Sequence, residues 1–319
     1  LNLTFPAGKT TALVGPSGCG KTTLMRMLAG FEQPTSGRIL LQGKDLSGTP
    51  PYKRPTNMMF QSYALFPHMS VLENAAYGPT VKGLGKEKSR EMALEKLALV
   101  GLKGFENRYP SELSGGQQQR VAVARALVLE PQVLLFDEPL SNLDAKLRRR
   151  VREEIRELQQ DLNLTVAYVT HDQEEALELA DRVVVMSQGK IEQVGSADDI
   201  YDRPQSAFVF SFVGDSARLP VTVREGHVIF RGFETGLRTT VADGQRQIFF
   251  RPRDILLQNE GGAFEGRIVS TRRLAGARIA EIDTGIAELT DRVEIELPLG
   301  VSAEQGERIR FLPHRFAIF

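Results

Sequence analysis

A glycine-rich loop that contains a lysine is the first stretch whose residue types and spacing indicate chemistry. Residues 15–23 read Gly-Pro-Ser-Gly-Cys-Gly-Lys-Thr-Thr. The glycines let the backbone turn back so that successive N–H groups point into one cavity, and the start of a helix adds partial positive charge there. This cavity fits a polyphosphate. We expect Lys21 to reach the β- and γ-phosphates, and the Thr22 hydroxyl to ligate the Mg²⁺ that bridges them.

The elements on either side of the loop support this interpretation. Residues 11–14 form an apolar run typical of a buried strand, and residues 22–29 have the pattern of a helix that ends at Gly30. Strand, glycine loop and helix are the context in which the motif binds phosphate. The expected phosphate-binding residues are Gly15, Pro16, Ser17, Gly18, Cys19, Gly20, Lys21, Thr22 and Thr23.

Two adjacent carboxylates follow a second apolar strand. Residues 132–136 read Gln-Val-Leu-Leu-Phe, and Asp137 and Glu138 come directly after them. Ligands of open α/β sheets bind at the carboxyl ends of the strands. Adjacent residues of a strand point to opposite sides, so we expect Asp137 to ligate Mg²⁺ and Glu138 to face the attacking water. The alternative is a solvated acid pair in a turn before Pro139.

One of the four histidines follows a third apolar strand. Residues 164–169 have the composition of a buried strand, and His171 comes two residues later. If the strands are parallel, His171 emerges at the edge that holds the two carboxylates. The sequence therefore predicts that His171 contacts the γ-phosphate, the alternative being a purely structural histidine.

A second loop of small residues precedes a second helix. Ser114, Gly115, Gly116 and Gln117 lead into a run of strong helix formers at residues 121–127, at the end of a helical insert over about residues 70–128. By the same dipole argument this helix start is a second phosphate-binding end. The alternative is an ordinary helix N-cap.

Composition restricts the class of protein. A chain of 319 residues suggests two domains, and 40 basic against 40 acidic residues leave no net charge to attract nucleic acid. No apolar run approaches the roughly 18 residues of a membrane span. The single cysteine, Cys19, excludes an internal disulfide. The chain opens at Leu1 inside a stretch, residues 1–5, that we expect to be a strand, so we expect further sequence upstream.

The chain changes character after Gly214, which we take as the boundary between domains 1–214 and 215–319. An apolar bridge at residues 207–213 precedes it, and short strands separated by glycines and charges follow. This pattern predicts a small β-barrel or sandwich that acts as a regulatory or interaction module. The expected strands are 220–223, 227–230, 246–250, 264–270, 277–283, 292–297 and 307–312.

These motifs occur together in one order, with Gln61 after the phosphate loop and Ser-Asn-Leu-Asp at residues 141–144 after the acid pair. Over residues 1–213 the chain resembles an ABC transporter ATPase subunit. The resemblance implies a P-loop NTPase core of RecA-like α/β type with a helical subdomain. It also implies that the ligand is ATP with Mg²⁺, that residues 15–23 are the Walker A loop, and that the Walker B strand is 133–137.

The resemblance also implies roles for single residues. Glu138 polarises the hydrolytic water, Gln61 contacts Mg²⁺ and that water, and His171 is the switch histidine. Ser114, Gly115, Gly116 and Gln117 belong to the signature loop, which binds the γ-phosphate of ATP held by a partner subunit. Two copies joined head to tail then share two ATP molecules. The aromatic residue that stacks on adenine in this family is expected upstream of Leu1.

The residues around Gln61 and the β-rich segment after Gly214 resemble importer ATPases with an OB-like regulatory domain. These serve ferric iron, polyamines, sulfate, phosphonates or maltose, and residues 57–63 and 136–144 favour ferric iron or a polyamine. The implied partners are integral membrane permease subunits and, indirectly, a periplasmic or lipid-anchored solute-binding protein. The implied location is the cytoplasmic face of the inner membrane. The alternatives are a soluble ABC-type ATPase of DNA repair or translation, and an ATP-binding clamp that does not hydrolyse.

Overall fold

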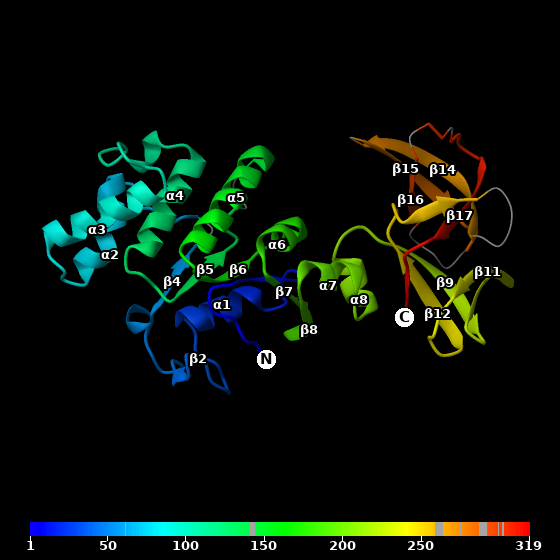
Figure 1. The fold of residues 1–319 in the computed structure, drawn as a ribbon, viewed down its shortest axis with the longest axis horizontal. Helices are drawn as coiled ribbons and strands as arrows, with labels where there is room; N and C mark the ends of the chain where they lie inside the picture. The colour runs from blue at the N-terminus through cyan, green and yellow to red at the C-terminus, as the bar shows by residue number, and fades with distance from the viewer. Residues whose placement is uncertain are drawn as a thin grey trace. The chain divides into compact units, whose positions relative to one another are not determined.

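The computed structural model contains two compact units, Leu1–Ile200 and Tyr201–Phe319 (Figure 1). It describes residues 1–60, 62–140, 144–258, 264–274, 276–286, 292–298, 300–301 and 303–319. The units divide earlier than the boundary expected at Gly214. The intervening segment belongs to the second unit because Nη1 of the buried Arg251 donates to the carbonyl oxygens of Phe210, Gly214 and Asp215.

The first unit is built on a sheet with the strand order β4-β5-β6-β1-β7-β8 in the described part of the chain. The first five are parallel, and β8 runs antiparallel to β7, so the sheet is mixed. The strands are β1 (Thr10–Val14), β4 (Thr56–Met59), β5 (Val133–Asp137), β6 (Thr165–Val169), β7 (Arg182–Ser187) and β8 (Lys190–Gly195).

The register brings the chemistry-bearing ends together at one edge of this sheet. Asp137 pairs with Val169, and Val169 pairs with Leu13 two residues before Gly15. The three central strands are apolar and largely buried, as strands covered on both faces must be. Their carboxyl ends therefore deliver the loop at Gly15, the acid pair and His171 side by side.

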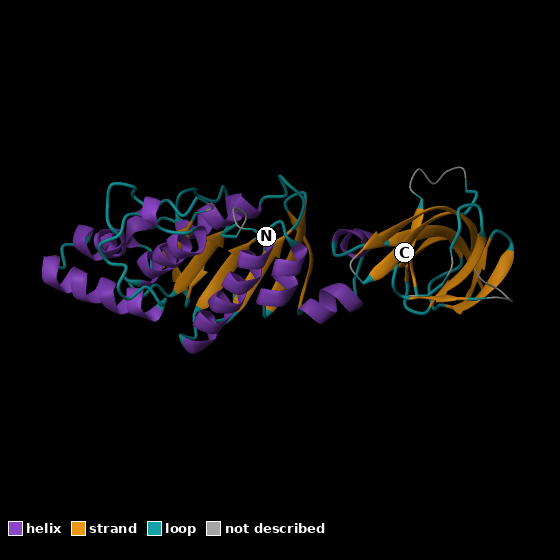
Figure 2. Cartoon of the chain, turned by 90° about the horizontal axis from the view of Figure 1, so that it is seen from above, coloured by secondary structure: helices purple, strands orange, loops and turns teal. Residues whose placement is uncertain are grey.

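Alternate residues of the central strands pack into two separate cores. Leu134, Phe136, Val166 and Tyr168 pack with helices α4 and α5, whereas Leu135, Ala167 and Val169 pack with Met25 and Ala29 of α1. Period-two alternation assigns these sets to opposite faces of the sheet. Figure 2 shows the helices on both sides of the strands. Each fully buried large side chain contributes about 2 kcal/mol to stability.

The helices of the first unit agree with the expected insert. Three of them make up the segment between β4 and β5, and α2 begins with a capping box in which Ser70 and Glu73 satisfy each other's backbone N–H. None of the described helices combines the length and apolar character needed to cross a bilayer. The bounds are α1 (Lys21–Ala29), α2 (Val71–Val81), α3 (Lys86–Leu99), α4 (Gly115–Leu127), α5 (Ala145–Asp161), α6 (Gln173–Leu179) and α7 (Ala197–Asp202).

One expected strand of the first unit is wrong. Residues 1–5 are irregular, and Leu3 and Phe5 instead pack against the core that contains α1. Further along, positive φ angles at Gln42 and Gly43 turn the chain between β2 (Leu40–Leu41) and β3 (Lys44–Asp45), which pair as a short hairpin.

The described part of the second unit is all-β apart from the last two residues of α7 and the helix α8 (Ala207–Phe212), which begins at the Ser206 N-cap where an apolar bridge was expected. Its strands form two antiparallel sheets over one core that contains Phe250, Phe264 and Phe311. The seven expected strands are present, and β11, β13 and β18 are additional. The strands are β9 (Ala217–Arg224), β10 (His227–Phe230), β11 (Phe233–Arg238), β12 (Gly244–Phe250), β13 (Ile255–Leu257), β14 (Phe264–Leu274), β15 (Ala277–Asp283), β16 (Val293–Leu297), β17 (Arg308–Pro313) and β18 (Ala317–Ile318).

Candidate functional site

The glycine-rich loop joins the end of β1 to the start of α1 and requires glycine at more than one position. Gly15 is buried, and a Cβ there would lie 2.2 Å from the Met186 carbonyl oxygen. Gly20 forms the N-cap of α1 with a φ of 103°, in the left-handed region that glycine adopts without strain. This conformation lets α1 begin at Lys21, directly after the loop, so the free N–H groups of its first turn face the loop.

The Lys21 ammonium lies inside the loop. Its Nζ donates to the carbonyl oxygens of Gly15 (2.8 Å) and Pro16 (3.1 Å) and lies 3.7 Å from Cys19 Sγ. Lys21 is only 7% exposed and Cys19 is buried, while Ser17, Gly18, Thr22 and Thr23 are exposed. The first turn of α1 carries no acidic residue. The loop therefore combines a cation, a helix N-terminus and exposed hydroxyls, which together suit a polyphosphate.

The Asp137 carboxylate lies in the field of the loop's cations. Burial raises its pKa, the neighbouring Glu138 raises it further, and Arg26 and Lys21 oppose both effects. Arg26 is four residues beyond Thr22, so the two share one face of α1. Asp137 therefore lies near that face, where a carboxylate and a hydroxyl oxygen supply the hard ligands that Mg²⁺ prefers. Among the described residues, no group of three or more His, Cys, Asp or Glu is placed to hold a metal by itself.

Glu138 and His171 meet at the ends of neighbouring strands. His171 Nδ1 lies 3.3 Å from Glu138 Oε2, with the histidine side chain 64% exposed and the glutamate 27%. Glu138 has a φ of 49°, in the left-handed region, and its backbone N–H donates to the Val169 carbonyl at 2.9 Å. A left-handed glutamate is a strained conformation that is typical of functional sites. Because of this turn, the Glu138 side chain does not continue the alternation of β5 and points away from the Asp137 side chain.

The signature residues form a capped helix start. Ser114 Oγ accepts from the Gln117 backbone N–H at 3.4 Å, and Gln117 Oε1 accepts from the Ser114 N–H at 2.9 Å. Gly115 and Gly116 open α4. Within one chain, no hydrogen bond or ion pair joins described residues 114–117 to described residues 15–23. Gln61 and residues 141–143 lie outside the described part of the chain, although β4 ends two residues before Gln61.

A polar cluster next to His171 was missed by sequence reasoning. Glu175 of α6 is buried, and it contacts side chains of β6 and of α5. Its one local signal is the spacing Asp172-x-x-Glu175, the pattern of a capping box. The structure uses only half of that pattern, because Asp172 caps α6 while the Glu175 carboxylate faces Thr170 rather than the Asp172 N–H.

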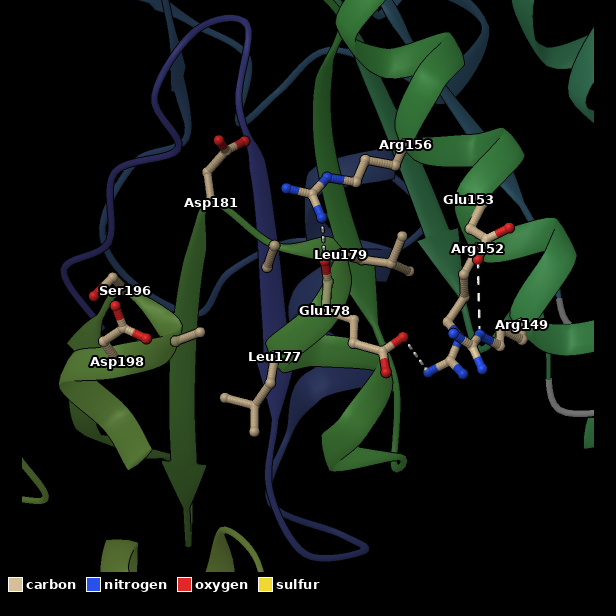
Figure 3. A pocket seen from close by; sticks show the side chains of 12 residues that line it. Arg149, Arg152, Glu153, Arg156, Leu177, Glu178, Leu179, Asp181, Ser196 and Asp198 are labelled. Atoms are coloured by element: carbon tan, nitrogen blue, oxygen red, sulfur yellow. Dashed lines mark hydrogen bonds and ion pairs between the residues drawn. The ribbon is translucent and has the colours of Figure 1, made fainter. Parts of the chain in front are cut away.

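A cavity of about 520 Å³ lies between α5, the end of α6 and the start of α7 (Figure 3). Its charges are largely paired, with Arg152 Nη1 3.1 Å from Glu178 Oε2 and Arg149 Nε 3.7 Å from Glu153 Oε1. Arg156 Nη1 donates to the Glu178 carbonyl at 3.1 Å. None of the lining residues belongs to the loop 15–23 or to the strand ends at Asp137 and His171. The cavity is therefore separate from the candidate site.

Comparison with known proteins identifies the family. The family model described as ABC transporter matches residues 1–141. The chain is 50% identical over 324 residues to the sulfate/thiosulfate import ATP-binding protein CysA 1 of Agrobacterium fabrum, which covers 100% of this chain and 93% of that protein. It is 52% identical over 309 residues to the Fe(3+) ions import ATP-binding protein FbpC of Brucella suis, which covers 94% of this chain and 88% of that protein.

A solved structure described as the dimeric structure of MJ0796, a bacterial ABC transporter cassette, is also similar. The TM-score is 0.54 with 31% identity, over 62% of this chain and 89% of that one. The fold class expected from the sequence, an ABC cassette core followed by an all-β domain, is confirmed. At half identity over its full length to an import ATP-binding protein, the chain belongs to the ABC transporter family as the ATPase subunit of an importer.

Proposed function

We propose that this ATPase subunit hydrolyses ATP at the edge of the sheet formed by the ends of β1, β5 and β6. Residues 15–23 bind the phosphates, with Lys21 as the mobile cation. Glu138 takes the proton of the attacking water, and His171 holds Glu138 and the γ-phosphate in register. The observation that carries the proposal is the distance of 3.3 Å between His171 Nδ1 and Glu138 Oε2. Glu138 directly follows Asp137, where burial raises the pKa of the carboxylate and the charge of Lys21 opposes that rise.

Mg²⁺ fits the same edge. Asp137 and the Thr22 hydroxyl would hold it, together with Gln61. Bound there, the ion would offset the negative charge of the phosphates during hydrolysis.

The signature helix start needs a second copy of the chain. Gly115 and Gly116 place the backbone N–H groups of the first turn and the positive end of the dipole of α4 at its start, which suits an anion, yet within one chain residues 114–117 make no described contact to residues 15–23. The similar MJ0796 cassette is described as dimeric. A head-to-tail dimer in which the Ser114 end of one copy covers the phosphate loop of the other accounts for both phosphate-binding ends.

The relatives support an inorganic solute. The similar proteins are named for sulfate/thiosulfate import and for Fe(3+) import at nearly equal identity, so we propose one of these two solutes. Permease subunits in the membrane would then change conformation when ATP binds to this subunit. This subunit would lie on the cytoplasmic face of the membrane. Uptake of radiolabelled sulfate and of radiolabelled ferric iron by cells with and without the chain tests the choice. Loss of neither uptake would refute both.

Sedimentation of the Glu138→Gln chain with and without Mg-ATP tests the shared site. We expect a dimer only with Mg-ATP, because this substitution preserves nucleotide binding and blocks its release by hydrolysis. The matched control is Lys21→Ala combined with Glu138→Gln, which should stay monomeric because the loop loses the cation that binds the phosphates. A Glu138→Gln chain that binds Mg-ATP and remains monomeric would overturn the shared site.

A further inference from the structure

His171 is exposed, yet both of its neighbours in the chain are fixed by buried side chains. The Thr170 hydroxyl accepts a hydrogen bond from the Asp172 backbone N–H at 2.9 Å, bridging over His171. Asp172 in turn accepts from the backbone N–H groups of Glu174 (3.0 Å) and Glu175 (3.2 Å). The backbone on either side of the histidine is therefore held, although its ring is 64% exposed.

Glu175 is the centre of this arrangement. Its Oε2 accepts from the Thr170 hydroxyl at 2.7 Å and from the Tyr168 hydroxyl at 3.3 Å, and the residue is only 3% exposed. The side chains of Tyr168 and Thr170, two residues apart at the end of β6, both reach Glu175. His171, between Thr170 and Asp172, instead approaches Glu138. Glu175 thus holds the residue before the histidine without contacting the histidine in any described bond.

Arg148 ties the same segment to α5. Its Nη1 lies 3.2 Å from Asp172 Oδ2, and its Nε lies 3.7 Å from Glu175 Oε1. The Arg148 backbone N–H donates to the Asp144 carbonyl at 2.8 Å, which places the arginine in the first turn of α5. One side chain therefore connects the start of α5 to both acids of the His171 segment.

Burying the carboxylate of Glu175 costs free energy, and the need to fill space in the core does not explain why an acid occupies this position. Burial raises the pKa of Glu175, and the bonds from Thr170 and Tyr168 with the charge of Arg148 only partly oppose the shift. A buried ion pair rarely stabilises a fold more than apolar side chains of the same shape. A glutamate at this place is better explained by the geometry that it imposes than by the stability that it contributes.

We propose that Glu175 is a positioning residue for ATP hydrolysis, which with Thr170 and Arg148 forms a clamp that holds His171 against Glu138. The role rests on the proposed function, because it acts only through His171. When the clamp is broken, the fold and the phosphate loop persist, but the histidine samples orientations in which it no longer meets Glu138. Turnover then falls while the binding of ATP does not.

The test is steady-state ATPase kinetics of the full chain carrying Glu175→Gln or Thr170→Val, each alone and combined with His171→Ala. We expect each single variant to lower kcat about tenfold, since a misplaced group costs that much or more. The KM for ATP should stay within about twofold, because ground-state binding is unchanged. Thr170→Ser keeps the hydroxyl and should restore turnover. The matched control is Glu174→Gln, an exposed neighbour on α6.

The double variants separate positioning from mere folding. In the His171→Ala background, Glu175→Gln should cause no further loss of kcat, and its melting temperature should not fall. A further tenfold loss in that background, or a loss that follows the melting temperature, would show a structural role and overturn the proposal. Unchanged turnover of Glu175→Gln beside an impaired His171→Ala would overturn the clamp alone. Unchanged turnover of His171→Ala would refute the proposed role of the histidine, and the clamp with it.

Discussion

The Glu138 carboxylate and the His171 imidazole lie 3.3 Å apart although they follow different strands, β5 and β6. Two local features produce this approach. The parallel register sets Asp137 opposite Val169, so each residue emerges just beyond a paired position. The left-handed turn at Glu138 then redirects its side chain away from Asp137. The two carboxylates of the acid pair consequently lie in different surroundings, Asp137 near Lys21 and Arg26, and Glu138 near the histidine.

This pairing predicts that the two residues act as a unit in turnover. Glu138→Gln and His171→Ala should each lower kcat about 100-fold or more, the usual range for a lost acid–base group. The double variant should lose no more than the worse single one, because each side chain works through the other. Losses that multiply in the double variant would contradict the pairing.

A matched control for this prediction exists in the second unit. His227 Nδ1 lies 3.3 Å from Glu234 Oε2, the same kind of contact between a histidine and a glutamate. His227→Ala should leave ATPase turnover unchanged.

The phosphate loop should tolerate a methyl group at one glycine far better than at another. Gly15→Ala places a Cβ 2.2 Å from the Met186 carbonyl oxygen and 2.7 Å from Cys19 Sγ, so we expect a loss of about 3 kcal/mol in the free energy of unfolding. Gly18→Ala meets no atom within 4 Å and should lose only about 1 kcal/mol, for its positive φ. Urea unfolding of both variants measures the difference, and equal losses would show that the close contact to Met186 does not matter.

Asp137→Asn should stabilise the protein at neutral pH. A raised pKa means that the folded state binds the proton more tightly than the unfolded state, so the free energy of unfolding falls as the pH rises through this range. The loss of stability that comes from burying the charged carboxylate is fully present above the pKa of the folded state and absent below the ordinary pKa of about 3.9. The asparagine removes that cost, so its melting temperature should exceed the wild-type value at pH 7, with a gain that disappears in acid.

The exposed Glu91 provides the control, since Glu91→Gln should leave the melting temperature unchanged at both pH values. In the same Asp137→Asn sample, Mg-dependent turnover should fall. A melting temperature at pH 7 that is lower than the wild-type value would mean that the attraction of Asp137 to Lys21 and Arg26 outweighs its burial.

The sequence predicts those features of the site that depend on local signals. Apolar runs followed by glycine or acid identify β1 and β5, and the rule for parallel strands then predicts that His171 and Glu138 emerge at one edge. Contacts between side chains that are brought together only when elements far apart in the sequence pack against each other have no such local signal. Arg148 reaches Glu175 only because α5 and α6 lie side by side, and a buried glutamate on a helix looks in sequence like any solvated acid. The roles of Gln61 and of residues 141–143 stay predictions, because these residues lie outside the described part.

Residues 1–5 and 207–213 show a second kind of limit. Alternation of Leu1, Leu3 and Phe5 predicts a strand, but a strand needs a partner, and Leu3 and Phe5 pack on the core without one while Leu1 stays exposed. The apolar run at 207–213 suggests a bridge, whereas Ser206 caps it as a helix. In both stretches most of the apolar side chains are buried or partly buried, as expected, but the backbone has a different conformation from the one predicted.

The last prediction concerns Arg251, which holds the start of the second unit. Its Nη1 donates to the carbonyl oxygens of Phe210 (2.9 Å), Gly214 (3.2 Å) and Asp215 (3.0 Å), and the guanidinium lies 4.4 Å from the centre of the Tyr201 ring. Arg251→Met keeps the length of the side chain but leaves three carbonyl groups without this donor. We expect a loss of about 3 kcal/mol in the stability of this unit, because hydrogen bonds to a charged group are among the stronger ones.

Limited proteolysis of the full chain measures the effect directly. The Arg251→Met chain should be cut within residues 201–215 much faster than the wild type, whereas Arg238→Met, at an exposed arginine of β11, should be cut at the wild-type rate. ATPase turnover is expected to persist, because the cluster lies in the unit that does not carry the phosphate loop. If the Arg251→Met chain is as resistant as the wild type, then α8 is held by its apolar contacts alone and the hydrogen bonds of Arg251 do not set where the second unit begins.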